Sequence, residues 1–186
     1  INKLKVDKSP GLDGVHPRVL FELKNEISEP LHIIFRNSME KGKLPKEWKM
    51  ANITALYKKD DKTLPGNYRP ISLTSILCKL LESILCDHIV GYMKSNKLFN
   101  NNQYGFLKGR SSQRRYCCSR SWTSGQRSWT MDAPWIYADF SKSFDTVPHG
   151  RLISKLSGYG MQGKVLSWIG EFLMGRRQRV VVRGEA

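Results

Sequence analysis

The stretch "SLTSILCKLLESILCDHIVGYMK", residues 72–94, decides much of the fold. Its apolar residues recur three and four positions apart, which is the spacing that places side chains on one face of an α-helix. The repeating positions are Ile76, Leu77, Leu80, Leu81, Ile84, Leu85 and Ile89. The stretch therefore predicts an amphipathic helix over 72–94 that contributes one face to the core.

Shorter elements are predicted on both sides of this helix. "RVLFELKNEI" and "EPLHIIFRNSMEKG" predict two helices, the second beginning near Pro30 and ending at Gly42. "MANITALYKK" (50–59) predicts a strand and "DDKTLPGN" a turn. "PWIYADF" predicts another strand, "HGRLISKLSGYG" and "GKVLSWIGEFLMG" two helices, and "RQRVVVRGE" a last strand. Helices and strands without regular βαβ alternation indicate an α+β fold.

The charge balance points to a polyanionic partner. The chain has 186 residues, with 31 Lys and Arg against 16 Asp and Glu, for a net charge of +15. A merely basic, solvated surface is the alternative, but an excess this large favours nucleic acid. No apolar run approaches the length of a membrane span, so no membrane partner is expected. Because the first residue is Ile1 rather than Met, we expect a piece of a longer protein.

The four cysteines do not form a metal-binding pattern. Cys78, Cys86, Cys117 and Cys118 contain no C-x-x-C pair and have no histidine cluster beside them. Free thiols in a reducing compartment are therefore expected rather than a zinc site.

"IYADFSKSFDTVPH" (136–149) contains a candidate metal ligand. Asp139 ends a short apolar strand, and a carboxylate there is a suitable ligand for Mg²⁺, which prefers oxygen. The alternative is that Asp139 is a turn residue or a helix cap, as most aspartates after strands are.

Six ordered stretches together resemble one known family. They are "KSPGLDGVHPRVL", "PKEWKMANITALYKKDD", "NYRPISLTSILCKLLESIL", "NNQYGFLKGRSS", "YADFSKSFDTVPH" and "GRRQRVVVRG". In this order they resemble the reverse transcriptase of a non-LTR (LINE-type) retrotransposon, most closely the jockey-like branch. The resemblance implies a right-hand polymerase fold, with fingers and N-terminal helices in 1–110 and the first part of the palm in 136–186. It also implies an intracellular protein that binds an RNA template, a DNA primer and deoxynucleoside triphosphates.

The resemblance assigns roles to several residues. Asp139 and the backbone carbonyl of Phe140 would bind Mg²⁺, and Phe144 would be the steric gate against a ribose 2′-OH, with a core aromatic as the alternative. Lys58 and Arg69 would grip the incoming triphosphate, and Lys59 could share the role of Lys58. Lys108 and Arg110 would contact a nucleic-acid backbone, with solvated loop charges as the alternative.

The same resemblance places the family's "YADD" box after Ala186. We therefore expect this chain to lack two of three catalytic carboxylates and to be inactive alone. Two rival interpretations remain: a non-enzymatic basic module that binds RNA or DNA, and a structural remnant without function.

Residues 111–135, "SSQRRYCCSRSWTSGQRSWTMDAPW", do not fit the family. They contain no Leu, Ile or Val but three of the five Trp, where the family has a Leu-rich helix. Shifting the reading frame turns Tyr116–Cys117 and Cys117–Cys118 each into Leu, and Trp122–Thr123 and Trp129–Thr130 each into Asp. We infer two compensating frame slips, one near 112–116 and one near 136. A genuine Trp- and Arg-rich segment that stacks on bases is the alternative.

Overall fold

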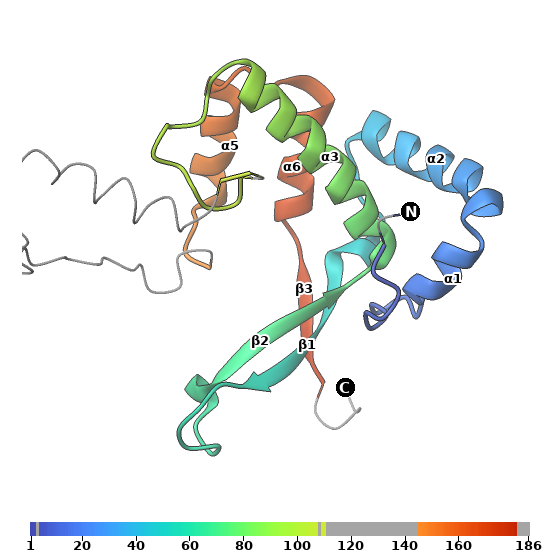
Figure 1. The fold of residues 1–186 in the computed structure, drawn as a ribbon, viewed down its shortest axis with the longest axis vertical. Helices are drawn as coiled ribbons and strands as arrows, with labels where there is room; N and C mark the ends of the chain where they lie inside the picture. The colour runs from blue at the N-terminus through green and yellow to red at the C-terminus, as the bar shows by residue number, and fades with distance from the viewer. Residues whose placement is uncertain (3, 108, 111–144, 182–186) are drawn as a thin grey trace, which may run out of the picture. The chain divides into compact units, whose positions relative to one another are not determined.

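The computed structural model describes residues 1–2, 4–107, 109–110 and 145–181. The chain divides into two compact units, one formed by Ile1–His88 with Pro148–Ala186 and the other by Ile89–Val147. The described part combines helices with a small sheet, as the α+β prediction expects (Figure 1). The helices are α1 (Pro17–Glu22), α2 (Lys24–Lys41), α3 (Ile76–Ser95), α5 (His149–Gly158) and α6 (Gly163–Leu173), with short 3-10 turns at Lys46–Lys49 and Pro65–Asn67.

The sheet has three strands in the order β2-β1-β3. β1 (Met50–Tyr57) pairs antiparallel with β2 (Tyr68–Thr74), from Ala51↔Thr74 to Tyr57↔Tyr68. β3 (Arg177–Val180) runs parallel to β1 and pairs only with its first half, from Met50 to Ile53. The second half of β1 therefore has β2 as its only partner among the described strands, and its residues are exposed. Figure 1 shows this hairpin as a long two-stranded ribbon.

A buried cluster, called the helical core below, packs beside the start of β1. Its members come from the segment after α2, from α3 and from α6, and they are Leu44, Trp48, Cys78, Leu81 and Trp168. Phe35 and Met39 of α2 and Phe172 of α6 pack against it. The predicted apolar stripe of α3 thus contributes to the core, although Ile84 is 47% exposed.

The predicted start of the long helix was wrong. Residues 72–74 belong to β2, and α3 begins only at Ile76. The hydroxyl of Ser75 accepts a hydrogen bond from the backbone N–H of Cys78, which caps the first turn of the helix. Leu73 and Thr74 suit a strand as well as a helix, so the apolar pattern alone did not place the boundary. The predicted strand 50–59 likewise ends earlier, at Tyr57.

The boundary between the first two helices was also placed wrongly. Pro30 lies inside α2, and the break between α1 and α2 falls at Leu23. The change of direction at Leu23 allows both Leu20 and Leu31 to be buried, and this burial offsets the backbone hydrogen bond that Pro30 cannot donate. The predicted end at Gly42 is confirmed, because Gly42 adopts a left-handed conformation with φ of 60°.

Several predictions lie outside the described residues. They are the strand in 134–140, the aberrant segment 111–135 and the end of the last strand beyond residue 181. Within the described ranges, no helix is both long and apolar enough to span a membrane.

Candidate functional site

The end of the β1–β2 hairpin, residues 56–69, brings two predicted site residues together; it is called the hairpin end below. Leu56 pairs directly with Arg69, and the N–H of Lys58 donates to the carbonyl of Asn67 at 2.9 Å, which extends the ladder by one pair. Because residues two apart on a strand share a face, Lys58 and Arg69 lie on the same face as diagonal neighbours. Lys59 comes after the last of these pairs. The ladder therefore fixes the position of Lys58 but not that of Lys59.

Hydrogen bonds within the turn give the hairpin end a defined shape. Asp61 accepts from the N–H of Thr63 at 2.9 Å through its carboxylate and from the side chain of Asn67 at 2.8 Å through its carbonyl. The N–H of Thr63 lowers the pKa of the Asp61 carboxyl. The hydroxyl of Tyr57 donates to the carbonyl of Asp60, which has a positive φ of 70°. The turn is thus tied to the strands by side chains as well as by the ladder.

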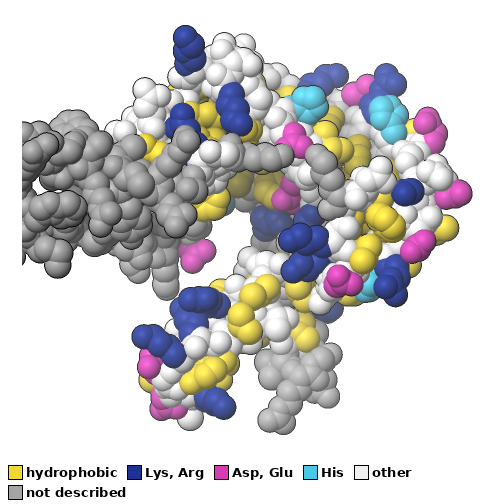
Figure 2. Space-filling model, in the orientation of Figure 1, with side chains coloured by type: hydrophobic (Ala, Val, Ile, Leu, Met, Phe, Trp, Pro, Cys, Tyr) yellow, Lys and Arg dark blue, Asp and Glu magenta, His cyan; other side chains and the backbone are white. Residues whose placement is uncertain are grey.

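The other face of the hairpin end carries two tyrosines that the sequence analysis did not single out. Tyr57 and Tyr68 face each other across the strands, with ring centroids 5.6 Å apart, and the ammonium of Lys62 lies 5.5 Å from the Tyr57 ring centroid. The two tyrosines directly flank the turn sequence "KKDDKTLPGN", and aromatic pairs commonly face each other across hairpins. This flanking pattern could have predicted the pair from the sequence. Figure 2 shows Lys and Arg side chains together with hydrophobic and acidic ones over this end.

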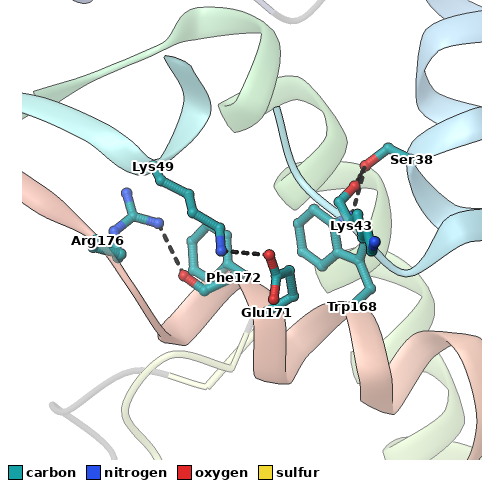
Figure 3. Close-up of polar contacts among 7 residues, drawn as sticks. All are labelled: Ser38, Lys43, Lys49, Trp168, Glu171, Phe172 and Arg176. Atoms are coloured by element: carbon teal, nitrogen blue, oxygen red, sulfur yellow. Dashed lines mark hydrogen bonds and ion pairs between the residues drawn. The ribbon is translucent and has the colours of Figure 1, made fainter. Parts of the chain in front are cut away.

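Polar contacts join α6 to earlier parts of the chain near the start of β1, which is called the base of the sheet below (Figure 3). The indole N–H of Trp168 donates to the Ser38 hydroxyl at 3.0 Å, and that hydroxyl donates to the Lys43 carbonyl at 2.7 Å. The ammonium of Lys49, directly before β1, forms an ion pair with Glu171 of α6. The pair thus joins the residue before β1 to α6, the helix that precedes β3.

Arg176, in the turn between α6 and β3, contacts the end of α6. Its guanidinium donates to the Phe172 carbonyl at 3.2 Å and lies 4.6 Å from the centroid of the Phe172 ring. It therefore fixes the turn from which β3 starts, one residue before Arg177.

Arg110 organises its own loop. Its Nη1 atom donates to the carbonyls of Asn100, Asn101 and Gln103 at 3.4, 3.1 and 2.9 Å. Together with Lys94 and Lys97, it also lines a hollow of about 800 Å³ within the second compact unit. The remaining N–H groups of the guanidinium are available for a backbone phosphate, so the predicted nucleic-acid contact stays a prediction.

The other predicted site residues, Lys108, Asp139, Phe140 and Phe144, lie outside the described residues. Across the parts of the chain that are described, no three His, Cys, Asp or Glu side chains gather where they could hold a metal ion. The described residues therefore contribute the basic hairpin end to the candidate site.

Comparison with known proteins gives one consistent family. Residues 56–185 match the family "Reverse transcriptase (RNA-dependent DNA polymerase)". The "Probable RNA-directed DNA polymerase from transposon BS" of Drosophila melanogaster is 31% identical over 84% of the chain. The "RNA-directed DNA polymerase from mobile element jockey" of Drosophila funebris is 25% identical over 99% of the chain, and its namesake of Drosophila melanogaster is 31% identical over 57%.

The chain spans only part of these relatives, 17%, 20% and 12% of their respective lengths. The family match alone covers more than half of the chain and includes the hairpin end from Leu56 onward. Reverse transcriptases take a nucleic-acid template and nucleotide substrates and use a divalent metal ion. The chain belongs to the reverse transcriptase (RNA-dependent DNA polymerase) family, and its relatives are the polymerases of non-LTR retrotransposons such as jockey.

Proposed function

We propose that this chain supplies the fingers and the first part of the palm of an RNA-directed DNA polymerase. The complete enzyme extends a DNA primer with deoxynucleoside triphosphates on an RNA template. The observation that carries the proposal is the shared face of Lys58 and Arg69 on the hairpin end, inside the region that matches the family. A triphosphate is a multiply charged anion, and this face presents it with two cations on a fixed ladder.

The two cations serve the triphosphate in different ways. The planar guanidinium of Arg69 can donate two parallel hydrogen bonds to phosphate oxygens, whereas the ammonium of Lys58 acts as a mobile point charge. The bonded turn holds the backbone of both residues at one end of the ribbon, so the turn itself needs little ordering when the nucleotide binds.

The chemical step is assigned to residues 139–144. The Asp139 carboxylate and the Phe140 carbonyl are both oxygen donors, the kind that Mg²⁺ prefers, so this donor set fits the ion. When bound, Mg²⁺ supplies stabilisation of the attacking and leaving oxygens of phosphoryl transfer. Phe144 excludes a ribose 2′-OH by occupying the space that it would need.

Primer extension on an RNA template tests the proposal, in a polymerase that joins this chain, with the reading frame of 111–135 restored, to a downstream palm with the "YADD" box. Arg69→Ala should raise KM for the deoxynucleotide roughly 10- to 100-fold, because it removes charge-assisted hydrogen bonds. Arg69→Lys should recover part of the loss. Asp139→Ala should abolish extension, and Phe144→Val should lower the ratio of deoxy- to ribonucleotide incorporation. Extension that is indifferent to both Arg69→Ala and Asp139→Ala would contradict the proposal.

A non-enzymatic nucleic-acid-binding module is the second candidate, favoured by the net charge of +15. Under this alternative, Arg69→Ala weakens RNA binding by the 186-residue chain, while the fused polymerase that carries the same change keeps its nucleotide KM. Measuring RNA affinity and nucleotide KM on the same variant therefore separates the two functions.

A further inference from the structure

The two tyrosines of the hairpin end form a platform whose position is fixed by the ladder. Tyr57 and Tyr68 are directly opposite each other, as the last of the strand pairs between β1 and β2. The alternation of side chains along a strand puts them on the face opposite to Lys58 and Arg69. Tyr57 is 38% exposed and Tyr68 is partly exposed, so the pair is not part of the core.

Each ring is held at both ends. The backbone of each residue lies in the ladder, and each hydroxyl donates to a carbonyl of the turn, Tyr57 to Asp60 and Tyr68 to Lys62, the latter at 2.8 Å. Rings fixed in this way lose little conformational entropy when a planar ligand stacks on them. The interplanar angle of 60° leaves the ring faces unstacked on each other.

The charges around the pair indicate the class of ligand. The ammonium of Lys62 lies 5.5 Å from the Tyr57 ring centroid. The hairpin end keeps a positive balance, with four cations, Lys58, Lys59, Lys62 and Arg69, against two carboxylates, Asp60 and Asp61. Exposed aromatic rings interleaved with cations suit single-stranded nucleic acid, because bases stack on the rings while cations meet the phosphates. Duplex nucleic acid does not offer unpaired base faces to such a surface.

We propose that Tyr57 and Tyr68 form a stacking platform for unpaired bases of a single-stranded RNA, the template strand before it pairs. This inference rests on the proposed function. It assigns the two faces of the hairpin end to two ligands: the triphosphate contacts Lys58 and Arg69, and the unpaired template contacts the tyrosines. Stacking of a base on a tyrosine is stronger than one exposed cation–π contact, so a base displaces Lys62 from the Tyr57 ring and leaves its ammonium for a phosphate.

The test compares two probes on the intact 186-residue chain. One is a short fluorescein-labelled oligouridine, and the other has the same backbone with abasic sites in place of the bases. Fluorescence anisotropy gives both affinities at one fixed salt concentration. The double variant Tyr57→Leu and Tyr68→Leu should bind oligouridine about 5- to 100-fold more weakly and the abasic probe unchanged.

Two controls separate the rings from the fold. Tyr57→Phe with Tyr68→Phe keeps the rings, removes the hydroxyl bonds to the turn, and should retain oligouridine affinity within about twofold, because a phenylalanine ring still stacks. Tyr92→Leu removes a tyrosine of similar exposure, 40%, from α3 and should change neither affinity. Equal weakening by Tyr92→Leu and by the leucine double variant would overturn the platform.

Photocrosslinking of the unaltered chain covers the case in which the leucine variant does not fold. An oligouridine carrying 5-iodouridine should crosslink to Tyr57 or Tyr68, and crosslinks confined to other residues overturn the inference. If the leucine variant weakens both probes equally, the platform is wrong while template binding stands. If the unaltered chain binds neither probe at low salt, template binding under the proposed function fails as well.

Discussion

The helical core and the hairpin end adjoin opposite halves of the same strand, β1. In the helical core no side chain is more than 8% exposed, and the indole of Trp168 is both buried and hydrogen-bonded. At the hairpin end Leu56 is 51% exposed, Tyr57 is 38% exposed, and the turn is held by hydrogen bonds within residues 57–68. Burial stabilises the first region, and a local bonded ladder stabilises the second.

The difference teaches where stability and binding are located. A ligand-binding surface must stay accessible, so it cannot gain the free energy that burial of apolar area supplies. The hairpin end instead keeps its shape through the register and the tied turn, while Lys49, Glu171 and Arg176 anchor the other end of the sheet to α6. Substitutions should therefore affect stability at one end of β1 and binding at the other.

The largest expected effect is on stability, from Trp168→Ala. Loss of the indole leaves a cavity in the helical core, removes its stacking on Phe172, and leaves the Ser38 hydroxyl without this donor. We expect the free energy of unfolding to fall by about 3–5 kcal/mol. Urea denaturation followed by circular dichroism measures it. Trp168→Phe keeps an aromatic ring and should cost less, and equal costs for the two variants would contradict a cavity as the main cause.

The second effect concerns pH and Cys78. This thiol has no exposed surface, and burial, followed by the nearby Glu82 carboxylate, raises its pKa above the ordinary value of 9.0. The folded protein then keeps a proton that the unfolded chain releases, so stability is present below pH 9 and is lost as the pH rises above it. The loss is about 1.4 kcal/mol for the pH unit above the unfolded pKa.

Denaturation of the original chain and of Cys78→Ala at several alkaline pH values isolates this effect. Other groups titrate in the same range in both proteins, so the difference between the two slopes belongs to Cys78. Cys86 is exposed, so Cys86→Ala serves as a matched control that removes a thiol without changing the core. Parallel slopes for all three proteins would show that Cys78 is not buried as described.

Local patterns in the sequence predicted part of this architecture. The apolar stripe of 76–89 and the strand before "DDKTLPGN" were found because their signals lie within single elements. β2 was missed because Leu73 and Thr74 continue an apolar pattern that the helix shares. The parallel pairing of Ile53 with Val180 and the bond between Trp168 and Ser38 join residues more than a hundred positions apart, and no local pattern reports them.

The candidate site also has a part that the sequence predicted and a part that only the structure shows. Lys58 and Arg69 were assigned by resemblance to the family, but their common face follows only from the β1–β2 register. The tyrosine pair depends on that register too, which explains why it was not singled out. Asp139, Phe140, Phe144 and Lys108 remain predictions, because they lie outside the described residues.

A smaller effect is expected from the ion pair at the base of the sheet. The Lys49 and Glu171 side chains are 18% and 36% exposed, so solvent screens part of their attraction. Lys49→Met should lower the free energy of unfolding by less than about 1 kcal/mol. A double-mutant cycle with Glu171→Gln measures the coupling. Coupling near zero would mean that packing of α6, rather than this pair, holds β3 beside β1.

The smallest effect on stability belongs to Lys58→Gln at the hairpin end. Lys58 is exposed, and its backbone N–H, which bonds to Asn67, is unchanged by the substitution. We expect the free energy of unfolding to change by less than about 0.5 kcal/mol. Because the proposed function gives Lys58 to the triphosphate, the salt dependence of RNA affinity should change no more than for any lost surface charge. A direct contact between Lys58 and an RNA phosphate would instead lower the slope of log affinity against log salt by about 0.7, the value for one single-strand contact.

Lys41→Gln supplies the matched control for that measurement. Lys41 is an exposed lysine at the end of α2, and its substitution removes the same charge away from the hairpin end. A general effect of net charge would lower the salt slope equally for both variants. A specific contact lowers it only for Lys58→Gln, and a bound deoxynucleoside triphosphate that competes for Lys58 should then remove the difference. Equal slopes without the nucleotide would assign RNA binding to the overall charge and leave the Lys58 face to the triphosphate alone.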